Sequence, residues 1–248
     1  MYNPYSLIGK TILVTGASSG IGRATAIECS KMGATLIITA RNQERLQETL
    51  TQLEGEGHQS IPAELSTEEN IKQLCAQIPE IDGLAHCAGV SALTPIMALN
   101  EQKLHDVFST NYYAPALLTK HLAKAKKIRN GGSLVYVASI SGISNVATAL
   151  STYGSSKSAI NTFMQYAALE FSGKRIRCNS VLPGRIETPL LQNQTMSNEE
   201  IQKDIEKYPL KRYGNVTEVA QTIIFLLSDA TKWITGTSIT IDGGRSLT

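Results

Sequence analysis

A tyrosine and a lysine lie one helical turn apart in the segment "YGSSK", which covers residues 153–157. Positions i and i+4 of a helix lie on the same face, so the side chains of Tyr153 and Lys157 would point the same way. A phenol normally ionises at about pH 10, and a nearby positive charge lowers its pKa by favouring the phenolate. The spacing therefore predicts an acid suited to proton transfer, although two unrelated surface residues would give the same short motif.

A glycine-rich segment, "TGASSGIG", follows a short apolar run and leads into a segment of helical period. Glycine at a strand-to-helix turn permits positive φ and a close approach of a ligand to the backbone. The first N–H groups of a helix lack partners within the helix and bind anionic phosphate well. The segment predicts a dinucleotide site formed by Gly16, Ser18, Ser19, Gly20, Ile21 and Gly22.

Short apolar runs alternate along the chain with longer segments of helical period. The apolar runs are 11–15, 35–39, 83–87, 133–138, 176–182 and 238–241, and helical segments include 22–32, 44–54, 68–78 and 216–228. The runs are apolar throughout, which is typical of parallel strands buried on both faces. This alternation predicts an α/β fold with a doubly wound parallel sheet between two layers of helices.

Length and composition indicate an ordinary globular protein. The 248 residues are enough for one large α/β domain over 1–248, and 42% of them are hydrophobic and 18% charged. The net charge of +2 is too small to indicate a nucleic acid or a membrane surface as partner. Neither a signal sequence nor a long apolar span is evident, so we expect a cytoplasmic protein. The four cysteines are scattered, which predicts neither a metal site nor a disulfide framework.

The order of the motifs resembles the short-chain dehydrogenase/reductase family, and most of all its 3-oxoacyl-[acyl-carrier-protein] reductases. The matching segments are "TGASSGIG", "HCAG" at 86–89, Asn111, "ASISG" at 138–142, "YGSSK", "PGRIETP" at 183–189 and "ITGTSITIDGG" at 234–244. The resemblance implies a Rossmann-like sheet of about seven strands in the order 3-2-1-4-5-6-7, with a nicotinamide dinucleotide at the switch point. It also implies a homotetramer or homodimer.

The same resemblance implies a catalytic set. Tyr153 would be the general acid and base, and Lys157 would lower the pKa of Tyr153 and hold the ribose hydroxyls of the cofactor. Ser139 would donate a hydrogen bond to the substrate oxygen; it is preferred to Ser141, which could be a turn residue. Asn111 would hold a water that relays protons to the lysine.

The residue after the second apolar run bears on the choice of cofactor. An acidic residue there would bind the 2′-hydroxyl of NAD, whereas this chain has Ala40 and then Arg41, whose guanidinium suits a phosphate. We therefore expect NADP(H) rather than NAD(H), with Ser18 as a second contact, unless Arg41 is only the solvated start of the next helix. The resemblance adds further cofactor contacts at Glu64, Leu65, Ala88, Gly89, Pro183, Gly184, Ile186 and Thr188.

The chain departs from the family pattern at three positions. His86 and Cys87 stand where the family usually has two asparagines, and Glu64 stands where it has an adenine-binding aspartate. We expect His86 to be an interior histidine with a hydrogen-bond partner and Cys87 to be a small buried residue. The adenine contact at Glu64 is left open.

The substrate is less well specified. The family transfers hydride between a nicotinamide and a carbonyl or secondary alcohol, and a lid at 189–213 would set specificity through residues such as Leu190, Leu191 and Met196. A 3-oxoacyl thioester is one candidate, and a sugar, polyol or other small alcohol is another. A protein that binds NADP without catalysis is a third alternative, which the retention of the catalytic set disfavours.

A basic segment at 120–129 could dock an acidic carrier protein that bears the acyl group. Basic residues near a helix end also favour the helix dipole and commonly form a solvated face, so both interpretations remain open. The residues concerned are Lys124, Lys126, Lys127 and Arg129.

Overall fold

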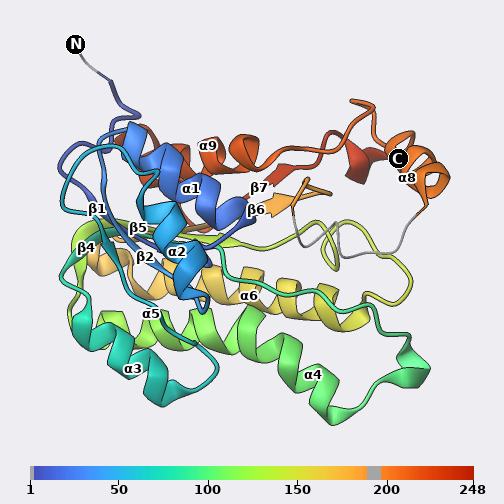
Figure 1. The fold of residues 1–248 in the computed structure, drawn as a ribbon, viewed down its shortest axis with the longest axis horizontal. Helices are drawn as coiled ribbons and strands as arrows, with labels where there is room; N and C mark the ends of the chain where they lie inside the picture. Colours follow the sequence, from blue (N-terminus) through green and yellow to red (C-terminus); the bar gives the residue numbers. More distant parts are fainter. Residues whose placement is uncertain (1–2, 189–196) are drawn as a thin grey trace.

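A seven-stranded parallel sheet runs through the protein in the order β3-β2-β1-β4-β5-β6-β7 (Figure 1). The computed structural model describes residues 3–188 and 197–248. The strands are β1 (Thr11–Thr15), β2 (Thr35–Thr39), β3 (Gln59–Ser60), β4 (Ile81–His86), β5 (Ile128–Val137), β6 (Arg177–Pro183) and β7 (Ser238–Ile241). The predicted fold and strand order are confirmed. The order reverses between β1 and β4, which is where ligands of doubly wound sheets bind.

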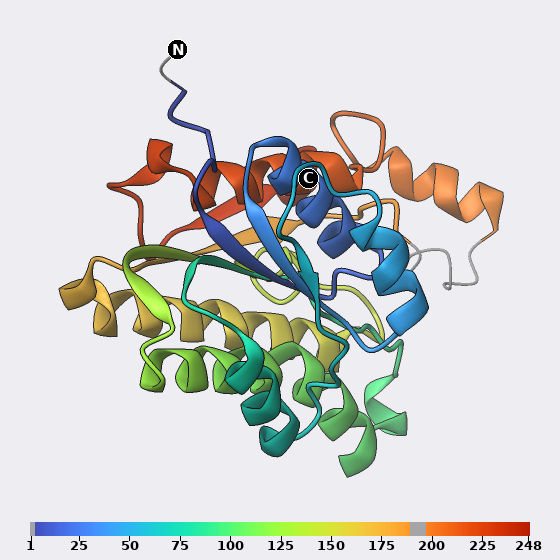
Figure 2. The same cartoon turned by 60° about the vertical axis from the view of Figure 1, so that its left-hand side comes forward.

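Helices cover both faces of the sheet (Figures 1 and 2). One face carries α1 (Gly20–Lys31), α2 (Gln43–Leu50) and α9 (Val216–Leu227). The other carries α3 (Glu68–Gln77), α5 (Ala114–Lys124) and α6 (Ser151–Glu170). Two further helices, α4 (Glu101–Phe108) and α8 (Asn198–Ile205), lie toward the end of the molecule where the strands finish. None of the described helices is both long and apolar enough to cross a lipid bilayer.

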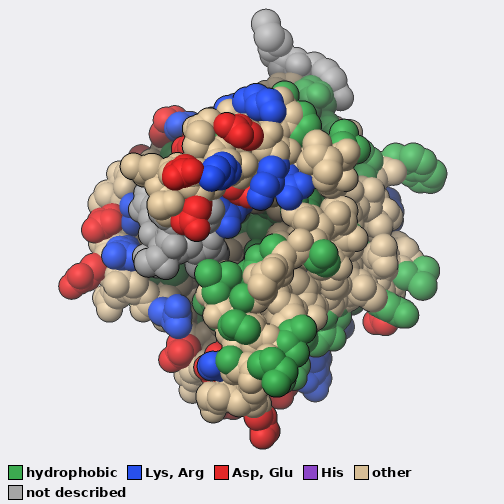
Figure 3. All heavy atoms as spheres, turned by 90° about the vertical axis from the view of Figure 1, so that its right-hand side faces the viewer, with side chains coloured by type: hydrophobic (Ala, Val, Ile, Leu, Met, Phe, Trp, Pro, Cys, Tyr) green, Lys and Arg blue, Asp and Glu red, His purple; other side chains and the backbone are tan. Residues whose placement is uncertain are grey.

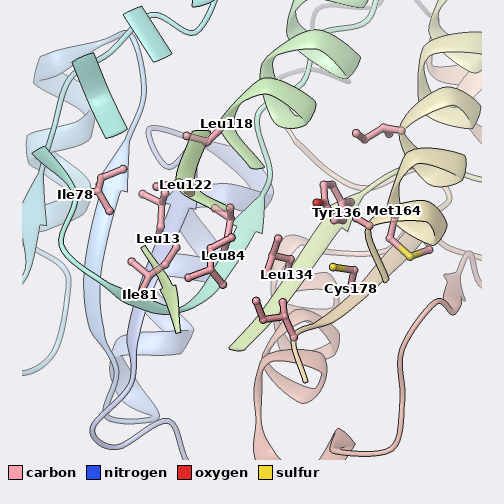
Figure 4. Packing of buried hydrophobic residues seen from close by; sticks show 14 of the residues in the cluster. Leu13, Ile78, Ile81, Leu84, Leu118, Leu122, Leu134, Tyr136, Met164 and Cys178 are labelled. Atoms are coloured by element: carbon pink, nitrogen blue, oxygen red, sulfur yellow. The ribbon is translucent and has the colours of Figure 1, made fainter. Parts of the chain in front are cut away.

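Five strands of the sheet, β1, β2, β4, β5 and β6, contribute side chains to two separate cores. In β1, Leu13 packs into the core beneath α3, α5 and α6, whereas Ile12 and Val14 pack into the core beneath α1 and α9. Figure 4 shows the first core, in which Leu13 and Leu118 lie among side chains from neighbouring strands and helices. Burying one such side chain contributes about 1.5–3 kcal/mol. The uninterrupted apolar runs are therefore explained by burial on both faces.

Three element boundaries differ from the sequence-based expectation. The strand β3 has only Gln59 and Ser60, so it has no apolar run and is defined by its pairing with β2. The helix α2 ends at Leu50, because Gln52 N–H bonds to Thr49 at 3.0 Å and tightens the chain into a turn. The strand β5 begins earlier than expected and shifts its register against β4 near Gly83. Contacts with neighbouring elements set these boundaries.

Candidate active site

Tyr153 and Lys157 lie on one face of α6, in its first two turns. The Nζ atom of Lys157 is 5.9 Å from the centre of the Tyr153 ring, as the spacing predicted. The lysine is buried, and its Nζ donates a hydrogen bond of 2.7 Å to the carbonyl oxygen of Val137, the last residue of β5. This bond joins α6 to the carboxyl end of the central sheet and sets the position of the amine.

Ser139 lies just beyond the end of β5, on a segment with two hydrogen bonds to β6. Ala138 N–H donates to Val181 at 2.9 Å, and Ile140 N–H donates to Pro183 at 3.1 Å. The buried Ser139 side chain forms a hydrogen bond with the Tyr153 side chain and also accepts one of 3.1 Å from the backbone N–H of Ser141. Of the two candidate serines, Ser139 is thus the one placed against Tyr153.

The pKa values of the pair follow from burial more than from their proximity. Burial raises the pKa of Tyr153 above its usual value, and the hydrogen bond from Ser139 offsets part of that rise. Burial lowers the pKa of Lys157 to about 8. The Lys157 amine is turned to the Val137 carbonyl and is not among the causes of the Tyr153 shift, so the expectation that Lys157 lowers the pKa of Tyr153 stays a prediction.

Asn111 lies in a short π-helical segment (Ser109–Tyr113) between α4 and α5. Its Oδ1 accepts from Val90 N–H at 2.9 Å, and its Nδ2 donates to the Val90 carbonyl at 2.9 Å and to Ser156 Oγ at 3.0 Å. A Cβ on Gly89 would lie 3.2 Å from Lys157 Nζ and 3.5 Å from Asn111 Oδ1. The bulge therefore brings Asn111 next to the amine, as π-bulges commonly do at functional sites.

Ser156 belongs to this network, although nothing in the sequence singled it out. It is fully buried, and its Oγ donates to the Tyr153 carbonyl at 2.7 Å while accepting from Asn111. It thereby links the π-helical segment to the turn of α6 that carries the tyrosine. Its place within "YGSSK" was the one available signal.

The glycine loop forms a cradle whose backbone requires glycine at particular positions. Gly16 and Gly20 have φ of +68° and +53°, in the left-handed region that favours glycine. A Cβ on Gly16 would lie 2.7 Å from the backbone of Ala88, so no other residue fits there. Ser19 begins α1 without a side-chain cap and the first turn has no acidic residue, which leaves its N–H groups for an anion. The loop fits a dinucleotide pyrophosphate on these grounds.

Arg41 follows β2 and is exposed beside an open hollow over α2. The next residue, Asn42, caps α2 by accepting a 2.8 Å hydrogen bond from Arg45 N–H. Arg41 therefore directly precedes the N-cap of α2, as expected if it is only the solvated start of that helix. It also lies at the carboxyl edge of the sheet, one strand from the glycine loop, where a cofactor phosphate would be reached.

The remaining predicted cofactor residues also follow strand ends. Glu64 is exposed and Leu65 half-buried after β3, and Pro183 ends β6. Gly184 bonds to Ile241 of β7 at 2.9 Å, and Ile186 is buried and pairs with the segment at Gly214. Thr188 is the last described residue before the gap at 189–196. All of these residues lie at the carboxyl ends of strands. Glu64 and Leu65, however, follow the outermost strand β3, which is at the opposite side of the sheet from β6 and β7.

His86 is an interior histidine with a partner, as expected. Its side chain is buried at the end of β4, with Nε2 3.0 Å from the Thr119 hydroxyl and its ring stacked on Tyr136 at 4.7 Å between centres. Burial lowers the pKa of His86 to about 3, so the ring is neutral near pH 7. Burial also raises the pKa of the Cys87 thiol to about 12, so Cys87 is a neutral thiol.

Replacing His86 by alanine is expected to lower the free energy of unfolding by about 2–4 kcal/mol, because it leaves a cavity beside Tyr136 and removes one of the two hydrogen-bond partners of the buried Thr119 hydroxyl, the other being Tyr136. Denaturant unfolding followed by circular dichroism measures this loss. The matched control is His105→Ala on the exposed face of α4, with an expected loss of about 0–1 kcal/mol. Abolished turnover at unchanged stability would instead assign His86 to the chemistry.

The basic segment at 120–129 lies at the opposite edge of the sheet from Tyr153, because α5 runs back toward the start of β5 (Figure 1). Lys127 Nζ donates to the Cys75 carbonyl at 2.6 Å, at the end of α3. Arg129 forms ion pairs with Glu80 and Asp82. Lys127 and Arg129, two of the four cations proposed for the dock, are therefore already engaged within the chain, which weakens the carrier-docking interpretation of this segment.

The parallel sheet, the glycine cradle at its switch point and the tyrosine, lysine and serine beside it define an oxidoreductase that uses a nicotinamide cofactor. A family model described as "Enoyl-(Acyl carrier protein) reductase" matches residues 16–246. The chain belongs to the short-chain dehydrogenase/reductase family.

Relatives align with the chain over nearly its whole length. A tropinone reductase homologue of Arabidopsis thaliana is 34% identical, over 97% of this chain and 91% of the homologue. The 3-oxoacyl-[acyl-carrier-protein] reductase of Thermotoga maritima is 32% identical, over 96% and 98%. The solved structure of the Pseudomonas aeruginosa RhlG/NADP active-site complex is similar with a TM-score of 0.91 at 29% identity, over 99% and 100%. The whole architecture is therefore shared with known reductases.

Proposed function

We propose that the protein is an NADP(H)-dependent reductase of a carbonyl group, with Tyr153 as the proton donor to the substrate oxygen. The observation that carries this proposal is the convergence of Tyr153, Ser139 and Lys157 at the carboxyl edge of the sheet, beside the glycine cradle. Hydride transfer to the substrate carbon is the chemistry that a bound nicotinamide would supply. The reverse reaction uses the same groups.

Each residue of the set has a role that its geometry supports. Ser139 donates a hydrogen bond to the substrate oxygen, whose negative charge grows in the transition state. The Tyr153 phenol, with its raised pKa, keeps its proton until that oxygen becomes basic enough to take it. Lys157 binds ribose hydroxyls, and Asn111 holds a water next to the amine from its position in the π-helical segment. Val90 and Ser156 keep the Asn111 amide in one orientation.

We expect kcat/KM to fall as the pH rises through about 8, because the pKa of Lys157 is about 8. An amine is protonated below its pKa, so the ammonium form is present at neutral pH and is lost as the pH rises through this value. The measurement is kcat/KM between about pH 6 and 10 at constant ionic strength. Lys157→Arg, which stays charged, should abolish that fall in the activity it retains. A profile that is flat to about pH 10 would contradict the assignment.

NADP(H) is the proposed cofactor because Arg41 and Ser18 lie where the adenosine ribose would carry its 2′-phosphate. Arg41 lines the hollow over α2, and Ser18 lies half-buried in the glycine loop, which Arg23 joins to α2. The NADP complex of the Pseudomonas aeruginosa relative is consistent with this choice.

A substrate with an apolar group is supported by the side chains beside the site. Two loops, 90–98 and 141–150, are joined by a 2.8 Å hydrogen bond from Thr94 N–H to Ala149. They expose Ile96 (72%), Met97 (97%) and Val146 (87%). Figure 3 looks onto the side of the molecule where the strands end, and hydrophobic side chains gather there. Such a surface suits an acyl chain or hydrocarbon ring better than a polyhydroxylated sugar.

We accordingly propose a 3-oxoacyl thioester or a related apolar ketone as substrate, with a sugar, polyol or other small alcohol as the alternative. The Thermotoga maritima relative is named for such a thioester reduction. The lid proposed at 189–213 contains α8, whose Asp204 forms an ion pair with Arg185 at 3.4 Å. The lid residues Leu190, Leu191 and Met196 lie outside the described residues.

The experiment that tests this function follows NADPH absorbance with purified protein and a panel of 3-oxoacyl thioesters, apolar ketones and keto-sugars, with NADH in parallel. Preference for the thioester or the ketone supports the proposal. Activity confined to keto-sugars rejects the apolar substrate, and tight NADPH binding without turnover of any compound supports a non-catalytic protein.

A homotetramer or homodimer is proposed because the helices around the site expose apolar side chains. Tyr166 and Leu169 on α6 are 62% and 74% exposed, and Leu104 on α4 is 40% exposed. Helix faces of this kind commonly pack between subunits of symmetric oligomers. Light scattering coupled to gel filtration measures the mass, and a monomer at micromolar concentration would reject the proposal.

A further inference from the structure

The side chain of Arg23 joins the glycine loop to helix α2. It begins in the first turn of α1, and a single atom, Nη2, donates to three oxygens. The carbonyl oxygen of Ser18 lies 2.7 Å away, that of Arg45 lies 3.2 Å away, and Oε2 of Glu48 lies 3.1 Å away. One guanidinium therefore sets the distance between the loop and the helix that follows β2.

The uncharged hydroxyl of Thr49 forms a second connection between α2 and the glycine loop. Thr49 is fully buried on α2, and its Oγ1 donates to the Ala17 carbonyl at 2.9 Å. The N–H of Ala17 in turn donates to the Thr39 carbonyl at 3.2 Å, at the end of β2. Ser18, next in the loop, is thereby held relative to the residues that follow β2, including Arg41.

Arg23 also decides the charge of the hollow over α2. Arg41, Glu44 and Glu48 all line that hollow, so two carboxylates face the place proposed for the 2′-phosphate. The ion pair between Arg23 and Glu48 neutralises one of them. Arg23 Nε is itself buried and has no hydrogen-bond partner among the described residues, so the guanidinium has further capacity to donate. Without Arg23, Glu48 would repel a phosphate at short range.

We propose that Arg23 is a positioning residue that determines specificity for the 2′-phosphorylated cofactor. It acts by holding Ser18 in place and by neutralising Glu48, and direct contact with the phosphate is not required. This inference rests on the NADP(H) preference proposed above. It predicts a selective effect, because NADH carries no group in the hollow for Glu48 to repel.

The test measures dissociation constants of NADPH and NADH by fluorescence titration of the full chain, so that no substrate is needed. Arg23→Ala is expected to weaken NADPH binding about tenfold and NADH binding less than about twofold. Arg23→Lys keeps the charge without the planar fork and should give a smaller loss of NADPH affinity. The NADPH loss in Arg23→Ala should also fall as salt is added, because the repulsion is electrostatic.

Two further variants distinguish the effect of the Glu48 charge from the effect of the hydrogen bonds that join the glycine loop to α2. Glu48→Gln in the Arg23→Ala background should restore about threefold of the lost NADPH affinity, because the bare carboxylate is gone. Thr49→Val removes the neutral bond to the loop but keeps the ion pair between Arg23 and Glu48, so it should weaken NADPH binding less than Arg23→Ala does, and its loss should not depend on salt. Thermal unfolding of each variant shows that it is folded during the titration.

The outcomes distinguish this inference from the proposed function. A wild-type protein that prefers NADH rejects the proposed cofactor, and this inference with it. A wild-type preference for NADPH that Arg23→Ala and Arg23→Lys leave unchanged rejects the role of Arg23 alone. Equal losses for NADPH and NADH in these variants also reject it, because they would show a purely structural contact.

Discussion

Replacing Tyr153 by phenylalanine is expected to lower kcat by about two to four orders of magnitude while leaving the dissociation constant of NADPH within about twofold. The change removes the phenol that hydrogen-bonds to Ser139 but keeps the ring on the same face of α6 as Lys157. The measurements are steady-state loss of NADPH absorbance and fluorescence titration of the cofactor.

Tyr166→Phe is the matched control for this variant. Tyr166 lies on the same helix and is 62% exposed, so loss of its hydroxyl should not change kcat or cofactor binding. Unchanged turnover in Tyr153→Phe would reject Tyr153 as the acid. Loss of NADPH binding together with turnover would show that the tyrosine chiefly shapes the cofactor site.

Replacing Arg41 by aspartate is expected to change the ratio of NADPH to NADH efficiency by about 10–100-fold in favour of NADH. The carboxylate would repel a 2′-phosphate and accept a hydrogen bond from the 2′-hydroxyl of NADH. Arg41 is exposed, so solvent screening keeps the expected change below that of a buried charge reversal. The measurement is kcat/KM with each cofactor at saturating carbonyl substrate.

Arg45→Asp provides the control for the change of charge. Arg45 is exposed on α2 but does not line the hollow that contains Arg41. Arg45→Asp should change the cofactor ratio by less than about threefold, because Arg45 does not line the hollow and solvent screens its exposed charge. An unchanged ratio in Arg41→Asp would support the alternative that Arg41 is only the solvated start of α2.

The strands of this fold could be predicted from the sequence where burial leaves a local pattern. The runs at 11–15 and 35–39 coincide with β1 and β2, because both faces of these strands are covered by helices. The short strand at Gln59 and Ser60 leaves no such pattern, since a central neighbour defines it through hydrogen bonds. The strand order came from the resemblance and is confirmed.

The candidate site divides along the same line. Helical periodicity was enough to place Tyr153 and Lys157 on one face, and the glycine spacing was enough to predict a cradle at Gly16. The contacts of Asn111 with Ser156 and Val90 depend on the π-helical segment, which no sequence pattern predicted. The charge of the segment at 120–129 was enough to suggest a dock for an acidic carrier protein. Its position away from Tyr153 and the contacts of Lys127 and Arg129 within the chain could not be predicted from that charge.

Local periodicity and backbone conformation were enough to predict the alternating strands and helices, the shared face of Tyr153 and Lys157 and the glycines of the cradle, and the order of the motifs indicated the family by resemblance. The raised pKa of Tyr153 and the hydrogen bonds by which Arg23 joins the glycine loop to α2 follow instead from tertiary packing. Desolvation and charge pairing depend on how residues far apart in the chain are packed, and no local pattern records that packing.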